Sequence, residues 1–457
     1  LTPKFGEIVA LKPKRIIFNP GTEDGNLMNQ AKEAGIEDLQ IYLTKVSQFD
    51  IEVFKGELEK YQIADTARLN VKGIFDSKMG TVQTEVITDE MIGFIIDSII
   101  ASAKTIDSED EVFIYEGDKE YREVKGLLNL ELGKVEASVK IKDTLELEKK
   151  VLALDKRITM VQAFYGESTQ KTTIVNSKGL NLEKEANNSL FGVYVIANDG
   201  TDQRTAIEYF QTNDYNDFDF DDIAKKGAEK AVALLGAQPC ESGDYEILLQ
   251  NNASSSLLGP HLSMFSAESV QKDVSLLKGK IGETIGSELV TIVDDPFMLK
   301  STKSGAFDDE GVATKYKELV KDGKLTGYLH NLKTAKKDNV QSTGNAFGRI
   351  APTNFYVKPG ELSFDDAVKS MKKGLVITSL QGTHSGTNPI SGDFSLQASG
   401  FLVKDGVIER PVALITVAGN YLELLKDVNA VCNDLKFGFS FIGSPSLKIS
   451  NLVVSGI

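Results

Sequence analysis

The sequence contains few of the residues from which disulfides and metal sites are built. Its 457 residues include two cysteines, Cys240 and Cys432, and three histidines, His261, His330 and His384. Two cysteines cannot form a disulfide framework or a zinc site made of cysteine alone. So low a cysteine content fits a reducing compartment, and we expect a cytoplasmic protein. Cys432 lies in an apolar neighbourhood and is expected to be a buried, unreactive thiol.

The histidines are not spaced as in zinc peptidases. Those enzymes usually carry two histidines on one helical face, with a glutamate beside the first as general base. None of the three has a second histidine within three to five positions, and His261 is followed by Leu262. A site assembled from distant histidines remains an alternative, but surface or hydrogen-bonded histidines are the simpler interpretation.

Positive charge and long apolar runs are also scarce. The 66 acidic residues outnumber the 51 basic ones, which gives a formal net charge of −15. Such a surface repels phosphate backbones unless a basic patch is present, and no run of Lys and Arg provides one. We therefore expect no direct nucleic-acid binding and no binding to anionic membranes. The most apolar stretch, residues 91–103, contains Asp97 and falls short of the ~20 apolar residues of a membrane span.

Residues 1–26 differ in character from the rest of the chain. They carry charges throughout and lack the apolar core of a signal peptide. The first methionine is Met28, where a helical pattern begins. We expect these residues to form a peripheral N-terminal extension.

Length and pattern predict an α+β protein of about two to three domains. Residues 27–236 are expected to form an N-terminal α+β domain, with an antiparallel sheet, flanking helices and an optional second boundary near 110–145. Pro239 and Gly243 mark the main boundary. Beyond it, residues 237–457 alternate short β-like runs with glycines, which predicts a larger β-rich C-terminal domain.

Hydrophobic periodicity predicts the individual elements. Helices are expected at 27–34, 91–103, 145–154, 220–235, 253–265, 362–371 and 420–428. Strands are expected at 49–55, 61–75, 81–87, 159–164, 171–176, 190–197 and 245–250, with turns at 76–80 and 177–179. Ser363, followed by Asp366 three residues later, is close to a capping box.

An acidic cluster precedes the helix predicted at 220–235. It comprises Asp214, Asp217, Asp219, Asp221 and Asp222. A calcium loop is disfavoured because Phe218 stands where an oxygen ligand is needed and the loop glycine is missing. The cluster is better explained by capping and by the helix dipole. No nucleophile elbow stands out, and residues 382–386 lack the ending of a phosphate loop.

Ordered sequence blocks carry a family resemblance. They are Ala31–Gly35, Val53–Glu59, Phe307–Gly311, Gly327–Asn331, Gly382–Gly386, Asn388–Ser395, Ala398–Leu402, Arg410–Val412, Thr416–Asn420, Asn433–Leu435 and Gly443–Leu447. Together they resemble the TldD/PmbA family, once labelled modulators of DNA gyrase. The resemblance runs from about residue 27 to residue 457.

The family has two branches. The TldD branch carries an H-E-x-x-x-H helix and a later cysteine that hold zinc, whereas the PmbA branch, also called TldE, lacks them. In this sequence Leu257–Ser266 contains one histidine, His261, with no adjacent glutamate and no second histidine. Residues 436–442 lead directly from Leu435 to Gly443, without the cysteine-bearing insertion of the TldD branch. Cys432 precedes that segment and is not carried over as a ligand. The chain therefore resembles the PmbA/TldE branch, and no catalytic or metal-binding residue is transferred to it.

The resemblance implies a cytoplasmic, non-catalytic partner of a TldD-like zinc peptidase that acts on unfolded peptides. No cofactor is expected in this chain, and the zinc is expected in the partner, while self-association into a homodimer stays open. The candidate chamber or dimer-interface residues are His261, Asp309, Glu310, His330, His384, Asn388 and Asp393. They could equally be turn or core residues. The alternatives are an autonomous peptidase with a non-standard site and a homodimeric peptide-binding scaffold.

Overall fold

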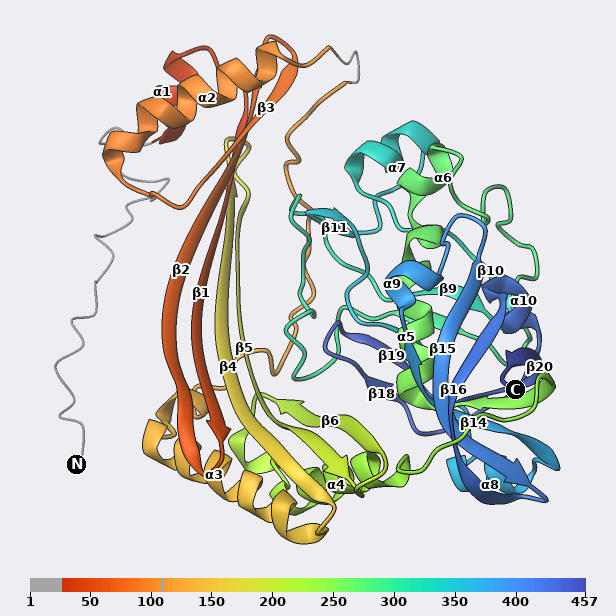
Figure 1. The fold of residues 1–457 in the computed structure, drawn as a ribbon. Coiled ribbons are helices and arrows are strands. Elements are labelled where there is room, and N and C mark those ends of the chain that lie inside the picture. The colour runs from red at the N-terminus through yellow and green to blue at the C-terminus, as the bar shows by residue number, and fades with distance from the viewer. Residues whose placement is uncertain (1–26, 108–110) are drawn as a thin grey trace. The chain divides into compact units, whose positions relative to one another are not determined.

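The computed structural model describes residues 27–107 and 111–457, so the extension expected at 1–26 lies outside the described residues. The chain divides into two compact units. The first comprises 27–46, 65–117 and 170–184, and the second comprises 47–64, 118–169 and 185–457. Helices and strands are mixed throughout, and this confirms the α+β class (Figure 1). The domain boundaries inferred from the sequence stay predictions.

The largest N-terminal element is a six-stranded sheet of order β3-β2-β1-β4-β5-β6. Its strands are β1 (Leu39–Phe54), β2 (Glu57–Phe75), β3 (Lys78–Thr84), β4 (Ile158–Asn176), β5 (Asn181–Asn198) and β6 (Gln203–Thr212). The β2–β3 and β5–β6 pairs are antiparallel. The strands expected at 159–164 and 171–176 are one strand, because the polar run 166–170 between them continues the ladder instead of looping out. β6 was not predicted.

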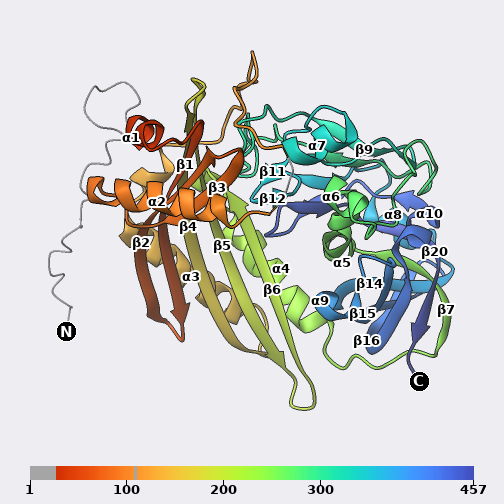
Figure 2. The same ribbon diagram turned by 90° about the horizontal axis from the view of Figure 1, so that it is seen from above.

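In the first unit, α1 (Leu27–Glu33) and α2 (Ile92–Lys104) pack on the sheet through Leu27, Ile95 and Ile99 (Figure 2). The short 3-10 turn η1 (Asp89–Met91) precedes α2. Both predicted helices are confirmed. The turn expected at 76–80 is shorter, because Asp76 and Ser77 both adopt left-handed backbone angles and reverse the chain in two residues.

In the second unit, α3 (Ala137–Leu154) and α4 (Phe220–Ala233) share a core with β1, β4 and β5. The 3-10 turn η2 (Leu132–Lys134) precedes α3, and the 3-10 turn η3 (Tyr215–Asp217) precedes α4. Asp219 caps α4 by accepting the N–H of Asp222, so the capping interpretation of the acidic cluster is confirmed. Gly227 lets α4 approach β5 closely, because a Cβ there would lie 2.7 Å from Val193 Cγ2.

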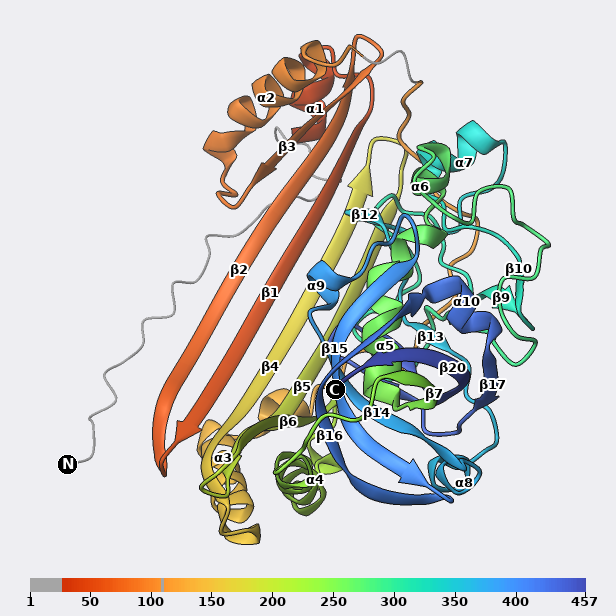
Figure 3. The same ribbon diagram turned by 45° about the vertical axis from the view of Figure 1, so that its right-hand side comes forward.

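A six-stranded sheet dominates the C-terminal part, in the order β16-β15-β14-β7-β20-β17. Its strands are β7 (Gly243–Leu249), β14 (Lys373–Gln381), β15 (Asp393–Lys404), β16 (Val407–Asn420), β17 (Val428–Val431) and β20 (Leu447–Ser455). The β7–β14 pair is parallel, and the long β15–β16 hairpin is antiparallel (Figure 3). An additional β16–β20 pairing closes five of the strands into a ring.

A second C-terminal sheet has the order β10-β9-β8-β13-β19-β18. Its strands are β8 (Ile292–Asp294), β9 (Lys317–Lys321), β10 (Lys324–Leu325), β13 (Phe355–Val357), β18 (Lys436–Phe437) and β19 (Ile442–Ser444), and a separate hairpin pairs β11 (Ala346–Phe347) with β12 (Arg349–Ile350). This strand content agrees with the β-rich domain expected from the sequence.

The C-terminal helices are short. They are α5 (Asn251–Leu258), the 3-10 helix η4 (Gly259–Phe265), α6 (Ala267–Gln271), α7 (Leu332–Asp338), α8 (Phe364–Lys369), α9 (Thr383–Gly386) and α10 (Tyr421–Lys426). The helix expected at 253–265 changes type at Gly259, where Pro260 follows without an N–H to donate. Ser363 caps α8, accepting the N–H of Asp366 as predicted. None of the helices in the two described ranges is both long and apolar enough to span a membrane.

Candidate functional site

One well-defined cavity in the second unit borders the edge strand β6. It has a volume of about 760 Å³ and is bounded by β6, α4, α5, the end of β14 and the β18–β19 hairpin. Its wall includes five consecutive residues of β6, from Thr205 to Tyr209. Among the strands in the described part of the chain, β6 pairs only with β5, so its outer edge is open for backbone hydrogen bonds.

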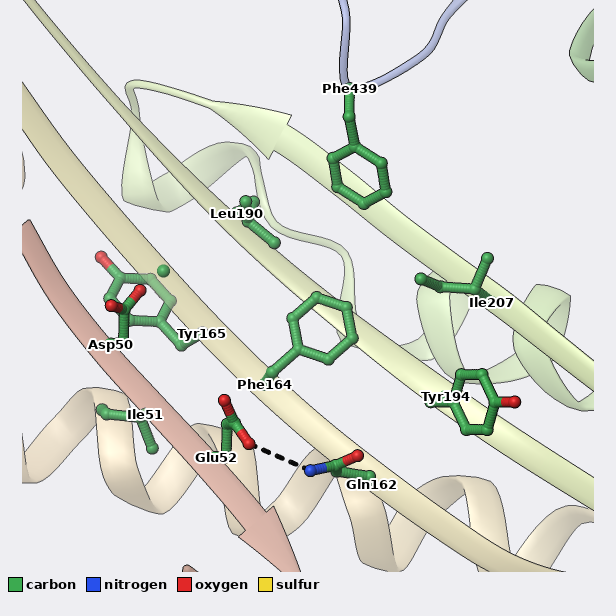
Figure 4. A pocket seen from close by; sticks show the side chains of 11 residues that line it. Asp50, Ile51, Glu52, Gln162, Phe164, Tyr165, Leu190, Tyr194, Ile207 and Phe439 are labelled. Atoms are coloured by element: carbon green, nitrogen blue, oxygen red, sulfur yellow. Dashed lines mark hydrogen bonds between the residues drawn. The ribbon is translucent and has the colours of Figure 1, made fainter. Parts of the chain in front are cut away.

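A smaller cavity of about 340 Å³ lies on the sheet face formed by β1, β4, β5 and β6 (Figure 4). Its surface is mostly apolar, with Phe164, Leu190 and Ile207 in the wall. The polar members include Glu52, whose carboxylate accepts a hydrogen bond of 3.0 Å from Gln162. Tyr194, Ile207 and Phe439 line both cavities, so the two spaces adjoin.

The alternation of β6 places its side chains on both sides of the sheet. Ile207 is exposed and lies in the wall of both cavities, whereas Glu208 is buried and reaches Lys230 of α4. Gly192 on the neighbouring β5 makes room on the cavity face. A Cβ there would lie 2.4 Å from the Phe164 ring and 2.9 Å from the carbonyl oxygen of Glu208. The glycine thus lets Phe164 lie across the strand as part of the wall.

A charged cluster lies in the wall of the larger cavity. Glu208 Oε1 accepts a hydrogen bond of 3.0 Å from Lys436 on β18, and its Oε2 accepts one from Lys230 on α4. The Glu208 side chain is only 5% exposed, so two ammonium groups neutralise a buried carboxylate. Burial lowers the pKa of Lys230, because the ammonium is partly removed from water.

An aromatic stack next to this cluster forms part of the cavity wall. Phe439, at the tip of the β18–β19 hairpin, stacks on Tyr209 with ring centroids 3.7 Å apart and an interplanar angle of 16°. Burial, followed by the nearby Glu208 charge, raises the pKa of Tyr209 to about 12, so its hydroxyl is neutral at physiological pH. The Phe439 ring lies on Tyr209, the last of the five consecutive β6 residues that line the cavity.

Helix α5 forms the opposite wall with Ser255 and Ser256. Two of the sequence blocks that carry the family resemblance hold this helix in position. Asp434 accepts hydrogen bonds from Asn251 Nδ2 and from both the N–H and the Oγ of Ser446. Ser254 Oγ also lies 2.7 Å from Ser444 Oγ. These blocks therefore fasten the start of α5 to the β19–β20 connection.

The three histidines lie in different parts of the C-terminal region. His261 on η4 is fully buried, stacks on Tyr421 at 4.2 Å, and has Nδ1 2.8 Å from the carbonyl oxygen of Leu257. Burial lowers the pKa values of both His261 and His330. His384 is exposed on α9. In the described ranges no group of three or more His, Cys, Asp or Glu side chains is arranged to hold a metal ion.

The predicted acidic and amide residues hold loops together. Asp309 accepts the N–H of Gly348, and Glu310 accepts the N–H of Leu332, which joins the loop at 308–311 to the segment after His330. Asn388 accepts the N–H of Ile390. Asp393 accepts hydrogen bonds from Asn420 and Ser391, and these bonds lower its pKa.

None of the seven residues singled out from the sequence lines either of the two cavities. Their assignment to a chamber or dimer interface stays a prediction. The residues that do line the cavities were missed because β6 was not recognised. The available signal was the alternation of Thr205, Ile207 and Tyr209, which are β-branched or aromatic, with Ala206 and Glu208.

Comparison with known protein families matches two consecutive parts of the chain. Residues 130–235 match the PmbA/TldA metallopeptidase central domain, and residues 242–456 match the PmbA/TldA metallopeptidase C-terminal domain. Both cavities draw their walls mainly from these two parts.

Comparisons with individual proteins agree with these domain matches. A metalloprotease of Methanothermobacter thermautotrophicus is 33% identical over 257 residues, which is 52% of this chain and 56% of that protein. A candidate modulator of a DNA gyrase from Thermotoga maritima has a crystal structure with a TM-score of 0.87 and 34% identity, covering 94% of this chain and 98% of that one.

The fold is also that of TldE from Thermococcus kodakarensis. That crystal structure has a TM-score of 0.87 and 24% identity, and the match covers 94% of this chain and 99% of that one. At this identity the likeness establishes the fold alone. With the domain matches and the relative at 34% identity, the conclusion is that this chain belongs to the PmbA/TldD family of metallopeptidase-related proteins.

Proposed function

We propose that this chain is a non-catalytic subunit that binds unfolded peptides for a TldD-like zinc peptidase. The observation that carries the proposal is the open edge of β6, which forms one wall of a cavity of about 760 Å³. An edge strand binds extended backbone through main-chain hydrogen bonds, and this mode of binding does not depend on peptide sequence. Extended backbone is a feature that unfolded peptides share.

The adjoining apolar cavity supplies the second part of such a site. Successive side chains of an extended peptide point to opposite sides. Side chains directed to the cavity face of β6 would meet Phe164, Leu190 and Ile207. Those directed the other way would meet the hydroxyl and amide groups in the larger cavity, including Asn252, Ser255 and Ser256. This combination suits peptides of varied composition.

The sequence supports the proposed division of labour. The segment where the zinc helix of the TldD branch is expected forms α5 and η4, with serines toward the cavity and His261 in the core. Activation of water requires a metal site on only one of two subunits. We therefore assign peptide binding to this chain and bond cleavage to the partner.

The test measures metal content and peptide cleavage with the full chain. The chain is purified alone, its bound metal is quantified, and cleavage of an unfolded peptide is followed with and without a TldD-like subunit. We expect no cleavage by the chain alone and increased cleavage when it is added to the partner. Stoichiometric zinc with chelator-sensitive cleavage by this chain alone would establish an autonomous peptidase instead.

A pair of variants tests whether β6 is the binding element. Ile207→Glu introduces a charge into the wall shared by both cavities, at a side chain that is 43% exposed. Val407→Glu introduces the same charge on β16, at a side chain that is 66% exposed and outside both cavities. Only Ile207→Glu should reduce the stimulation of the partner. If both variants reduce the stimulation equally, or if neither does, the β6 edge is excluded as the site. Separately, a stable homodimer that never exchanges with a TldD-like chain would favour a scaffold.

A further inference from the structure

The cluster around Glu208 holds more positive than negative charge. One carboxylate, Glu208, accepts hydrogen bonds from two ammonium groups, those of Lys230 and Lys436. An ammonium group has three donors, so each lysine retains donors beyond its bond to Glu208. The two lysine side chains are 34% and 32% exposed, and both line the larger cavity. Both lysines therefore present partly exposed side chains, with donors that Glu208 does not use, in the cavity wall.

The other carboxylate in the cavity wall does not cancel this excess. Glu229 is exposed and lies 3.9 Å from Lys225, one turn earlier on α4. The next lysine on the helix, Lys226, pairs with Asp222. Lys230 and Lys436 thus share Glu208 as their ion-pair partner, in a chain whose formal net charge is −15. A site with local cationic excess on such an acidic protein is suited to a single small anionic group.

The position of the cluster beside the stacked rings of Tyr209 and Phe439 indicates which anion it would take. The edge of β6 faces the cavity from Thr205 onward, and the cluster begins at Glu208. Immediately beyond, Phe439 stacks on Tyr209. A peptide that runs parallel to β6 along this edge would reach the cluster with its C-terminal end. Of the two groups present at the ends of every unmodified peptide, the terminal ammonium and the terminal carboxylate, only the carboxylate complements the two lysines.

We infer that Lys230 and Lys436 bind the C-terminal carboxylate of a peptide that lies along β6. This inference rests on the proposed peptide-binding function and specifies its substrate class as peptides with a free C-terminus. Hydrogen bonds from ammonium to carboxylate are charge-assisted and stronger than those between neutral groups. An open strand edge and a carboxylate site together recognise features that do not vary with sequence, as a subunit acting on many unfolded peptides requires.

The test compares forms of one decapeptide that lacks acidic residues. Binding to the full chain is measured by calorimetry for the free acid, for the C-terminal amide, and for an amide with a glutamate next to the last position. We expect the free acid to bind about tenfold more tightly than the simple amide, as one charge-assisted hydrogen bond allows. The glutamate-containing amide should bind like the simple amide.

Two variants connect the effect to the cluster. Lys436→Met should weaken binding of the free acid to the level of the amide and leave binding of the amide unchanged. Lys226→Met removes an ammonium from α4, the helix that carries Lys230, but outside the cavity. It should change neither the affinity for the free acid nor the affinity for the amide. Circular dichroism establishes that each variant is folded, and Lys230→Met replaces Lys436→Met if that variant fails to fold.

The outcomes separate this inference from the function on which it rests. If free acid and amide bind equally well, the carboxylate site is wrong and the peptide-binding function stands. If the glutamate-containing amide binds as tightly as the free acid, the cluster recognises side-chain carboxylates and the terminal assignment is overturned. If none of the three peptides binds, the proposed function fails, and the inference fails with it.

Discussion

Glu208 on β6 and Lys436 on β18 form an ion pair across 228 positions of sequence, with 3.0 Å between Oε1 and Nζ. The pair connects the edge of the six-stranded N-terminal sheet to the short hairpin that bears Phe439. Because Lys230 of α4 binds the other oxygen of the same carboxylate, three elements from two matched family domains meet at one buried group.

The first prediction concerns this buried carboxylate. Glu208→Gln removes the charge that balances two ammonium groups and leaves them close to each other. We expect the free energy of unfolding to fall by about 1–3 kcal/mol, since both lysines keep partial access to water. Urea unfolding measures the change. Glu229→Gln, at an exposed position on α4, is the control and should shift it by about 0.5 kcal/mol or less. Equal effects would show that Glu208 has no special role in stability.

The second prediction concerns the stacked aromatic pair. Phe439→Ala removes the ring that stacks on Tyr209 and lines both cavities. Covering about 30–50 Å² of this half-exposed ring would contribute about 0.7–1.3 kcal/mol to peptide binding, so its loss should weaken binding by about three- to tenfold. Calorimetric titration checks this. Phe94→Ala removes a similarly exposed ring from α2 and should leave peptide affinity unchanged. Unaltered binding to the Phe439 variant would place the peptide elsewhere.

The third prediction compares two glycines inside helices. Gly227→Ala forces a Cβ to within 2.7 Å of Val193 Cγ2, whereas a Cβ at Gly93 of α2 meets no atom within 4 Å. We expect Gly227→Ala to destabilise by about 1–2 kcal/mol through overpacking, despite its better helix propensity. Gly93→Ala should stabilise by about 0.5–1 kcal/mol. Thermal unfolding measures both, and a stabilising Gly227→Ala would mean that α4 can move away from the sheet at little cost.

The fourth prediction is a pH dependence of stability that originates at Asp308. This carboxyl is 1% exposed, and burial raises its pKa to about 7 even though it accepts N–H groups from Glu310, Val312 and Ala346. Between about pH 4 and pH 7 the folded chain holds a proton that the unfolded chain releases. The contribution of Asp308 to stability is therefore present below about pH 4 and is lost as the pH rises to about 7.

The variant Asp308→Asn isolates that contribution. In the native chain, titration of Asp308 should lower the free energy of unfolding by at most about 1.4 kcal/mol per pH unit across this window. The variant should not show this decrease. A constant offset is also expected, because an amide nitrogen cannot accept the N–H of Ala346. Urea unfolding is measured across this window and about one pH unit beyond it. This separates the pH slope of the free energy of unfolding from the pH-independent difference between the two proteins. Parallel curves would indicate that the three N–H donors keep Asp308 ionised throughout.

The fifth prediction concerns thiol reactivity. Both cysteines are buried, and desolvation raises the pKa of Cys432 to about 12, so its reactive thiolate is scarce near neutral pH. Ellman's reagent at about pH 8 should label Cys432 slowly in the folded chain and promptly after unfolding in urea. A Cys432→Ala variant identifies which thiol contributes the signal. Rapid labelling of the folded chain at Cys432 would contradict its assignment as an unreactive core residue.

Some of the structure could be derived from the sequence because local periodicity was enough. The spacing of Ile92, Ile95, Ile96 and Ile99 predicted α2, and all four side chains are buried. The acidic cluster before α4 and Ser363 before α8 were recognised as helix caps, since capping depends on neighbours three positions away, and within the cluster the structure identifies Asp219 as the cap. The family blocks likewise indicated the relationship that the domain matches establish.

Other features lacked a local signal. The polar run 166–170 has the composition of a loop, yet it lies within β4, because pairing in the sheet overrides the weak strand propensity of its residues. β6 did carry a local signal in its alternation, but its half-exposed residues have little hydrophobicity, so the pattern was weak.

The sequence by itself determined the α+β class, most helices, the caps of α4 and α8, and family membership, because these depend on neighbours or on ordered blocks of residues. Only the tertiary structure decided which polar residues share a site. It placed His261 in the core against Tyr421, and it brought Glu208, Lys230 and Lys436 to one cavity. The physical reason is that an ion pair or a cavity wall depends on distance in space, and sequence periodicity carries no information about residues 228 positions apart.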